Sequence, residues 1–340
     1  MIPDPIIGTG LHAVGGIAAS TCYTPFEKIS KWSWTAFWLV QAFFAWIVVP
    51  LILGIITVPH FFTILAHAPT DALWQAFLLG GLYGFGGMSF GFAIKHIGYS
   101  LTYTISIGIS AVFGTITPMI INGTLIKNIT EHGGSIMVGG MVIAILGVAI
   151  CGYAGFRKDN EAKDMNFNML LGLTLAIIGG LLSAVFNLSL VSGRPIANMA
   201  ANQGASIFQK NAEYIVSTSG CFVVNLIWFL FLGFRQNKLN ELLAFRKIGL
   251  KQFAKNYGLS ALAGTLWMTQ FFFFGLGQVF LEKFSYIGWL LHMTMLVFFG
   301  FIVGLFVKEW REVSNRTFYY LIGGLVVLFI SFVIISYGTT

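Results

Sequence analysis

Long apolar runs recur along the chain, separated by short polar connections. Most runs could cross a hydrocarbon core of about 30 Å as a helix that rises 1.5 Å per residue. The pattern predicts an all-α polytopic membrane protein with ten transmembrane helices. The predicted spans are Gly8–Tyr23, Trp34–Ile55, Ala72–Ile94, Gly98–Ile121, Ser135–Phe156, Met169–Val191, Ile207–Phe231, Tyr257–Phe280, Phe284–Val307 and Thr317–Tyr337.

Lysine and arginine are distributed unevenly over the connections between these spans. Fifteen of the 19 lie in odd-numbered connections, and the other four are Lys127, Arg194, Lys210 and Lys283. Because cationic connections stay in the cytoplasm, the odd connections are predicted to be cytoplasmic and both termini periplasmic.

A charged connection over residues 157–168 divides the spans into two sets of five. An odd number of spans per half makes the second half enter the membrane in the opposite sense, as in the inverted repeats of many transporters. The predicted organisation is a five-helix repeat over 1–156, a cytoplasmic linker over 157–168 and a second five-helix repeat over 169–340.

Composition agrees with this architecture, because 57% of the 340 residues are hydrophobic and only 9% are charged. The net charge of +7 lies mostly in connections and reports topology rather than nucleic-acid binding. The opening Met-Ile-Pro-Asp-Pro lacks the basic region of a signal peptide, so the first span is predicted to be retained. The three cysteines fall in apolar runs without metal-ligand spacing, and we expect no disulfide and no metal site.

The eighth and ninth spans are joined by a short connection, Leu281–Phe284, and are predicted to form a transmembrane hairpin. Trp267 and Gln270 lie in its first helix and Trp289 and His292 in its second, at similar depth. Indole faces pack against sugar C–H groups, while amides and imidazoles hydrogen-bond hydroxyls. These four residues therefore predict a chamber for a neutral sugar near the middle of the membrane.

Other spans also carry uncharged polar groups. Tyr103 and Ser106 belong to a hydroxyl-bearing face of the fourth span, and Asn187 lies inside the sixth. They are candidates for sugar contacts, with hydrogen bonding between helices as the alternative. Glycines at helical spacing from Gly80 to Gly91 predict close approach of a neighbouring helix or a surface that slides during transport.

A proton-coupled carrier needs a titrating side chain. Ionisable groups inside or beside the spans are His12, Glu27, Glu213, His292 and Glu309. Histidine titrates near neutrality after a small environmental shift, and His292 is the deepest of the five. We therefore take His292 as the first proton-coupling candidate, followed by His12 and Glu27, and expect no cofactor.

Two connections carry local expectations. The small polar segment Ser192–Ser206 is predicted to be a solvated loop. The segment Phe234–Asn256 alternates apolar residues with six cations and predicts an amphipathic helix lying on anionic headgroups.

Several motifs spread along the chain together resemble the L-rhamnose–proton symporter family of the drug/metabolite transporter superfamily. They are Thr21-Cys22-Tyr23 with Pro25-Phe26, Lys31-Trp32-Ser33-Trp34, Tyr83-Gly84 to Gly91, Ile107-Gly108-Ile109 through Thr117-Pro118 and Ile121-Asn122-Gly123, Trp267 with Gln270-Phe271-Phe272-Phe273, and Trp289 to Met293 with Lys308-Glu309-Trp310. The resemblance implies a two-repeat fold, proton-coupled uptake of a 6-deoxy sugar and a bacterial inner membrane location. It also implies a role in the site for Trp267, Gln270 and His292.

The resulting hypothesis is a symporter that carries L-rhamnose or a related sugar inward by alternating access, without an obligatory protein partner. Alternatives are sodium-coupled sugar uptake and a metabolite exporter or exchanger of the same superfamily. Anionic substrates would require cations in mid-span, and every Lys and Arg lies near a predicted span end. An enzyme would need a reactive constellation within the bilayer, which the sequence does not offer. A receptor would bind sugar without moving it.

Overall fold

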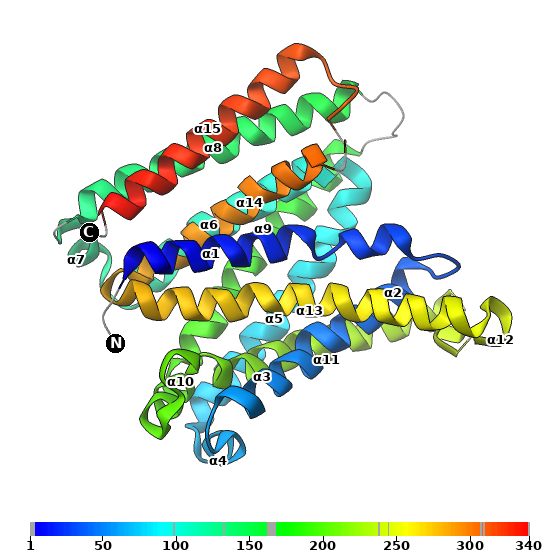
Figure 1. Cartoon of the computed structure of the whole chain (residues 1–340), viewed down its shortest axis with the longest axis horizontal. Helices are drawn as coiled ribbons and strands as arrows, with labels where there is room; N and C mark the ends of the chain where they lie inside the picture. The colour runs from blue at the N-terminus through cyan, green and yellow to red at the C-terminus, as the bar shows by residue number, and fades with distance from the viewer. Residues whose placement is uncertain are drawn as a thin grey trace. The chain divides into compact units, whose positions relative to one another are not determined.

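The computed structural model describes residues 4–97, 99–131, 133–161, 168–236, 239–243, 245–306, 308 and 310–338. Within these residues the chain is helical and has no strand (Figure 1). It divides into two compact units that each combine distant parts of the sequence. Unit 1 comprises Met1–Ser20, Gly86–Leu188 and Leu276–Thr340, and unit 2 comprises Thr21–Phe85 and Ser189–Gly275.

Nine helices of the described chain are long and apolar enough to span a membrane, which confirms a polytopic, all-helical membrane protein. They cover Trp34–Thr57, Thr70–Ile94, Thr102–Ile121, Gly134–Lys158, Leu170–Ser192, Asn211–Arg235, Leu250–Leu281, Phe284–Phe306 and Asn315–Ile335. The predicted first span corresponds to α1 (Pro5–Thr21), which has 17 residues and is not among these nine.

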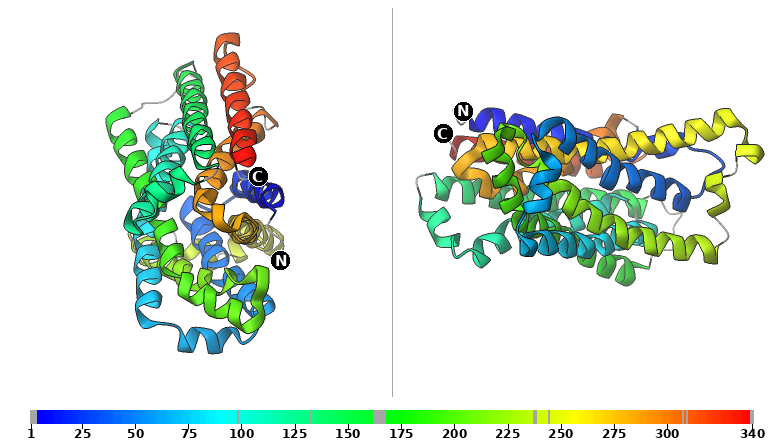
Figure 2. Two further views of the ribbon diagram at one scale, coloured as in Figure 1. Left: turned by 90° about the vertical axis from the view of Figure 1, so that its left-hand side faces the viewer. Right: turned by 90° about the horizontal axis from the view of Figure 1, so that it is seen from below.

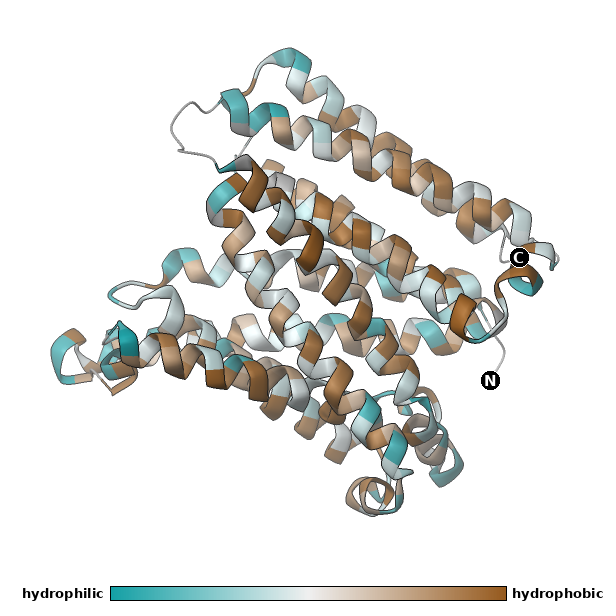
Figure 3. Ribbon diagram, turned by 180° about the vertical axis from the view of Figure 1, so that it is seen from behind, coloured by the Kyte–Doolittle hydropathy of each residue, from teal (hydrophilic) through white to brown (hydrophobic). Residues whose placement is uncertain are grey.

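Unit 1 consists mainly of long helices. Its elements are α1, the later part of α5 (Thr70–Ile97), α6 (Tyr99–Ile121), α7 (Leu125–Thr130), α8 (Gly134–Glu161), most of α9 (Met169–Ser192), the end of α13 (Leu250–Leu281), η6 (Glu282–Ile287), α14 (Gly288–Phe306) and α15 (Asn315–Gly338). Helices α8 and α15 lie side by side in both figures (Figures 1 and 2). Hydrophobic residues fill the middle of both helices and hydrophilic residues gather at their ends, as expected for spans (Figure 3).

Glycine allows α8 and α15 to pack closely and antiparallel. A Cβ atom added at Gly140 would lie 2.6 Å from Ile335 Cγ1, and one added at Gly324 would lie 2.6 Å from Cys151 Sγ. Residues with higher numbers in α8 contact residues with lower numbers in α15, so the two helices run antiparallel. Small residues at such positions let helix backbones approach within a membrane.

The charged end of this pair is held by Glu161. Its carboxylate accepts hydrogen bonds from the Ser314 N–H at 2.8 Å and from the Thr317 hydroxyl at 2.6 Å. Arg157 donates to Thr317 Oγ1 at 2.9 Å. The Ser314 N–H, followed by the Thr317 hydroxyl, lowers the pKa of Glu161 to about 2, because both stabilise the charged form.

Unit 2 contains more short elements. They are η1 (Thr24–Lys28), α2 (Trp34–Phe43), the π-helix η2 (Phe44–Val48), α3 (Val49–Thr57), α4 (Phe61–His67), the start of α5, α10 (Arg194–Ala200), the π-helix η3 (Ala201–Ala205), η4 (Ser206–Phe208), α11 (Asn211–Arg235), η5 (Leu239–Leu243), α12 (Phe245–Ile248) and most of α13.

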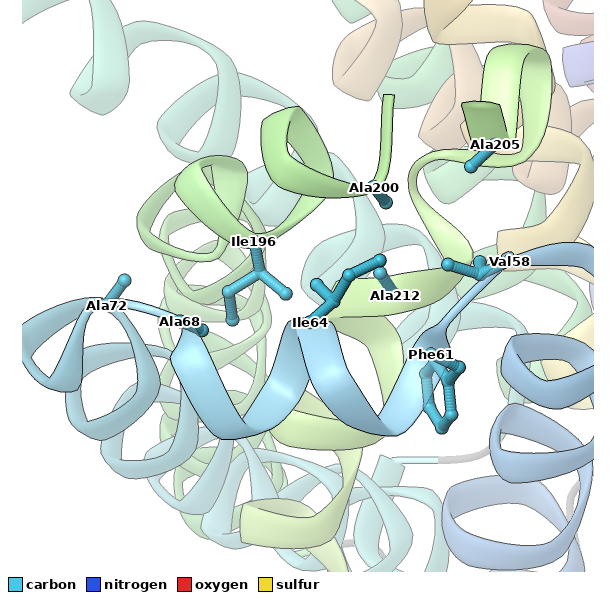
Figure 4. Close-up of a cluster of buried hydrophobic side chains, with 9 residues drawn as sticks. All are labelled: Val58, Phe61, Ile64, Ala68, Ala72, Ile196, Ala200, Ala205 and Ala212. Atoms are coloured by element: carbon cyan, nitrogen blue, oxygen red, sulfur yellow. The ribbon is translucent and has the colours of Figure 1, made fainter. Parts of the chain in front are cut away.

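The prediction that Ser192–Ser206 is a solvated loop is wrong. The segment folds into α10 and η3, which pack on α4 (Figure 4). Ile196, Ala200 and Ala205 are buried in this cluster, beside Phe61 and Ile64 of α4. The small apolar side chains between the polar ones therefore drive burial of the segment.

A single amphipathic helix over 234–256 is likewise not formed. The described part of the segment contains η5, α12 and the beginning of α13, and Gly249 has a φ of +82° between the last two. Leu242 and Ile248 pack against the cluster around Trp32. Part of their apolar surface is therefore covered by the protein itself, while Leu243 and Leu250 remain 77% and 72% exposed.

The glycine face of the third predicted span forms a close contact with α11. In unit 2, a Cβ atom at Gly80 would overlap the Ser217 carbonyl, and one at Gly220 would lie 2.9 Å from the carbonyl carbon of Phe77. Gly84 lies against Asn225, whose amide donates to the Gly84 carbonyl at 3.1 Å. Tight helix packing, one of the two predicted roles, is thus observed at Gly80 and Gly84.

Replacing Gly220→Ala should destabilise the protein, since the added methyl meets the backbone of α5. Overpacking of this kind costs about 1–3 kcal/mol, and a fall of roughly 2–8 °C in melting temperature follows for a chain of this size. Thermal unfolding in detergent measures the change. Gly139→Ala is the control, because no atom lies within 4 Å of the added Cβ; equal melting temperatures for the two variants would contradict the contact.

Replacing Glu161→Gln should lower the melting temperature above pH 4.5, where the wild-type carboxylate is charged and fully hydrogen-bonded. The folded pKa of about 2 lies below the usual 4.5, so this stabilisation is lost as pH falls from 4.5 toward 2. The difference in melting temperature between the two proteins should therefore narrow as pH falls from 4.5 to 3. A gap of constant size over that range would refute this account.

Candidate functional site

The predicted site residues fall into both units. Trp267, Gln270 and Glu27 belong to unit 2, and the remaining candidates belong to unit 1: Trp289, His292, Tyr103, Ser106, Asn187 and His12. The predicted chamber shared by all four hairpin residues stays a prediction. The connection within the predicted hairpin is short, because α13 ends at Leu281 and α14 begins at Gly288, with η6 between them.

Small residues of α1 bring it against α14 in unit 1. A Cβ atom at Gly16 would lie 3.2 Å from Met295 Cβ, and the Ser20 hydroxyl donates to the Leu296 carbonyl at 3.0 Å. His12 lies one helical turn before Gly16, as His292 lies one turn before Met295 and Leu296. The close contact therefore places the two histidines opposite each other.

His12 and His292 are both fully buried, with 0% of either side chain exposed. Their ring centroids are 5.6 Å apart and the rings meet edge to face at 63°. The last turns of α13 flank this pair, because a Cβ atom at Gly277 would lie 2.8 Å from His12 Cδ2 and Nε2. Glycine at position 277 thus leaves room for the His12 ring.

Trp289 packs against α6 at a position where a glycine leaves room for its indole ring. Its indole N–H donates to the Ser110 carbonyl at 2.9 Å, and its ring occupies the space that a side chain at Gly114 would fill. Asn187 of α9 donates to the Gly114 carbonyl at 2.7 Å. Gly114 therefore joins three helices of unit 1, and the polar atoms of Trp289 and Asn187 support that junction.

The hydroxyl face of α6 also contacts α9. Ser106 donates to the Ala176 carbonyl at 2.8 Å, and Ser110 donates to the Ser183 hydroxyl at 3.0 Å. These are the interhelical hydrogen bonds that the sequence left as an alternative. Tyr103, 6% exposed, packs near Leu296 of α14.

In unit 2, Trp267 belongs to a cluster of aromatic rings. It meets Trp46 edge to face with centroids 5.6 Å apart, stacks on Tyr83 at 6.4 Å and contacts Phe271 at 4.9 Å. Gln270 lies one turn along α13 and is 4% exposed. An amide beside broad aromatic faces can recognise both the hydroxyls and the C–H surface of a sugar.

Trp38 and Trp46 extend this cluster, and the sequence pattern did not reveal them. They are eight residues apart, which in a regular α-helix separates them by about 80° around the axis. The π-helical turn η2 inserts an additional residue and aligns them, so that their centroids lie 6.3 Å apart. The second predicted span contains three tryptophans, Trp34, Trp38 and Trp46, and this enrichment is the signal that could have pointed to the cluster.

Unit 2 also contains a buried carboxylate. Glu213 is fully buried and accepts a hydrogen bond from Lys210 at 3.1 Å, and Lys210 retains 18% side-chain exposure. The second carboxylate oxygen of Glu213 has no hydrogen-bond donor in the described part of the chain. Glu27, by contrast, is exposed.

Metal ligation finds no support within the described residues, where no group of three His, Cys, Asp or Glu side chains could hold an ion. Cys22, Cys151 and Cys221 are free and buried.

The ion pair predicts a coupled mutational effect. Lys210→Met leaves the Glu213 carboxylate buried without its cation and should destabilise the protein by roughly 3 kcal/mol, the lower end of the range for broken buried pairs. Adding Glu213→Gln should restore most of the loss, because the remaining amide carries no charge. Thermal unfolding of both single variants and the double variant tests this, and purely additive effects would rule the pairing out.

Comparison with known proteins gives a single family. Residues 2–340 match the family described as L-rhamnose-proton symport protein. Relatives named L-rhamnose-proton symporter occur in Escherichia coli strains SMS-3-5, 55989 and, from serogroup O8, IAI1. Each is 32% identical over 336 residues, which cover 98% of this chain and 97% of the relative. The similarity thus runs through the segments of both units.

Proposed function

The chain belongs to the L-rhamnose–proton symport family, and from this premise we propose that it carries L-rhamnose, or a related 6-deoxy sugar, into the cell together with a proton. The full-length family match is the observation that carries the proposal. Family membership makes the protein a transporter rather than an enzyme, and its nine candidate spans agree with a multi-pass protein of the bacterial inner membrane.

The proposed architecture has ten transmembrane helices in two inverted repeats, with both termini in the periplasm. Helix α1 would be the tenth span: its 17 residues extend about 26 Å, slightly less than a typical hydrocarbon core. Uptake would follow alternating access, in which the sugar site opens to one side of the membrane at a time.

The aromatic cluster around Trp267 supports a role in sugar binding. L-Rhamnose carries a methyl group at C6 where ordinary hexoses carry a hydroxymethyl group, so an indole face suits it better than a further polar group. Gln270 would hydrogen-bond the ring hydroxyls. In unit 1 the remaining sugar-contact candidates are Trp289, His292, Tyr103, Ser106 and Asn187, of which Ser106 and Asn187 would have to exchange their present carbonyl acceptors for sugar hydroxyls.

Proton coupling requires a side chain that titrates during the cycle, and His292, His12 and Glu27 are the candidates. Imidazole ordinarily has a pKa near neutral pH. Both histidines are also buried between helices, whereas Glu27 is exposed. This difference favours the two histidines over Glu27.

Transport by proteoliposomes tests the proposal. An inward proton gradient should drive L-rhamnose accumulation, and adding sugar should raise the external pH as protons enter with it. Sugar uptake that needs sodium and leaves the external pH unchanged would replace proton by sodium coupling. Uptake of neither L-rhamnose nor any 6-deoxy sugar would reject the function.

Trp267→Ala should weaken L-rhamnose binding about tenfold, the effect of losing roughly 1.4 kcal/mol of contact energy. Trp74→Ala is the matched control, because Trp74 of α5 is 59% exposed and contacts Phe77 rather than the Trp267 cluster. Concentration dependence of uptake gives the apparent affinity of each variant. Equal losses in both variants would remove Trp267 from the binding residues.

A further inference from the structure

The contact between α1 and α14 brings together two ionisable side chains that lie 280 residues apart in the sequence. Gly16 and Ser20 fix the register of the helices, and Gly277 of α13 leaves room beside the His12 ring. Neither ring is exposed. Two imidazoles buried edge to face require a functional explanation, because buried ionisable groups within a membrane are costly.

The surroundings of the pair contain no nearby fixed charge on their own helices. His12 is the only ionisable side chain of α1, and His292 is the only one of α14. On the elements packed against α14, the ionisable groups are Tyr99 and Tyr103 on α6, Cys151 and Tyr153 on α8, Tyr319, Tyr320 and Tyr337 on α15, Glu282, Lys283 and Tyr286 on η6, and charged residues at the joined ends of α8 and α15. Among these side-chain types, only imidazole has an ordinary pKa near neutral pH.

We propose that His12 and His292 together form the proton-binding site of the transporter and share a single proton. This inference rests on the proposed symport function. Two imidazolium ions 5.6 Å apart would repel strongly in a medium of low dielectric constant, so binding of one proton prevents binding of a second. The pair therefore carries one positive charge when loaded and none when empty, and one proton crosses with each sugar.

Glu213 is a less suitable carrier. Lys210 already balances its charge at 3.1 Å, so protonation of Glu213 would leave a cation without its partner. The histidine pair is neutral when empty, and a buried neutral imidazole needs no counter-ion. A proton can then enter or leave the pair when water, or another group that exchanges protons, reaches the rings as the helices open to one side.

Three variants test the shared site: His12→Asn, His292→Asn and the double variant. Asparagine keeps hydrogen-bonding capacity but does not titrate. In proteoliposomes, each variant should lose gradient-driven accumulation, so that the internal L-rhamnose concentration only equals the external one. Exchange of sugar across the membrane without a gradient should persist in His12→Asn, within about threefold of wild type, because His12 is not among the sugar-contact candidates.

An equal loss of gradient-driven accumulation in all three variants is the result expected specifically for one shared proton. Two independent proton sites would give partial loss in each single variant and complete loss only in the double variant, which would overturn the proposal. Gradient-driven accumulation that survives in any of the three would also overturn it. His67→Asn is the control, because His67 is an exposed histidine of α4 and should leave accumulation unchanged.

A measurement on the wild-type protein covers the case in which the variants do not fold. The reversal potential of sugar-driven current gives the ratio of protons to sugars, for which the shared site requires one; a ratio of two would overturn it. Failure of the proposed function is distinguishable, because wild-type protein would then show no L-rhamnose exchange at all.

Discussion

A polar side chain inside a bilayer must find its partner on a neighbouring helix, because the lipid supplies none. The distance between helix backbones therefore decides which polar groups can be buried. In unit 1, Gly114 admits the Trp289 indole to the Ser110 carbonyl. In unit 2, the missing side chain of Gly84 lets the Asn225 amide reach the Gly84 carbonyl. Glycine thus sets both the packing of the helices and the partners of their buried polar side chains.

Features that depend on local sequence could be predicted. Run length and hydropathy identified the nine long spans, because a helix must be apolar over about 20 residues to cross a membrane. Polar residues after Leu281 marked the short connection between α13 and α14. Spacing along one helical face indicated that Gly80 and Gly84 would meet a neighbouring helix, although not that this helix is α11.

Features that depend on register between distant helices could not be predicted. Nothing near His12 in the sequence indicates that it faces His292, since Gly16 and Ser20 fit many helix partners equally well. The π-turn that aligns Trp46 with other tryptophans breaks the very periodicity on which a sequence-based prediction relies. The predictions for Ser192–Ser206 and Phe234–Asn256 failed for a related reason. The apolar residues of these segments do not indicate which distant part of the chain they pack against.

The antiparallel contact of α8 and α15 has a consequence for biogenesis. Helix α8 leaves the ribosome long before α15, which ends the described chain. Its face at Gly140 and Gly147 therefore enters the membrane without the helix that later covers it. Until α15 is inserted, lipid or the insertion machinery must cover this face of α8, and the Glu161 carboxylate gains its Ser314 and Thr317 donors only when the two helices pair.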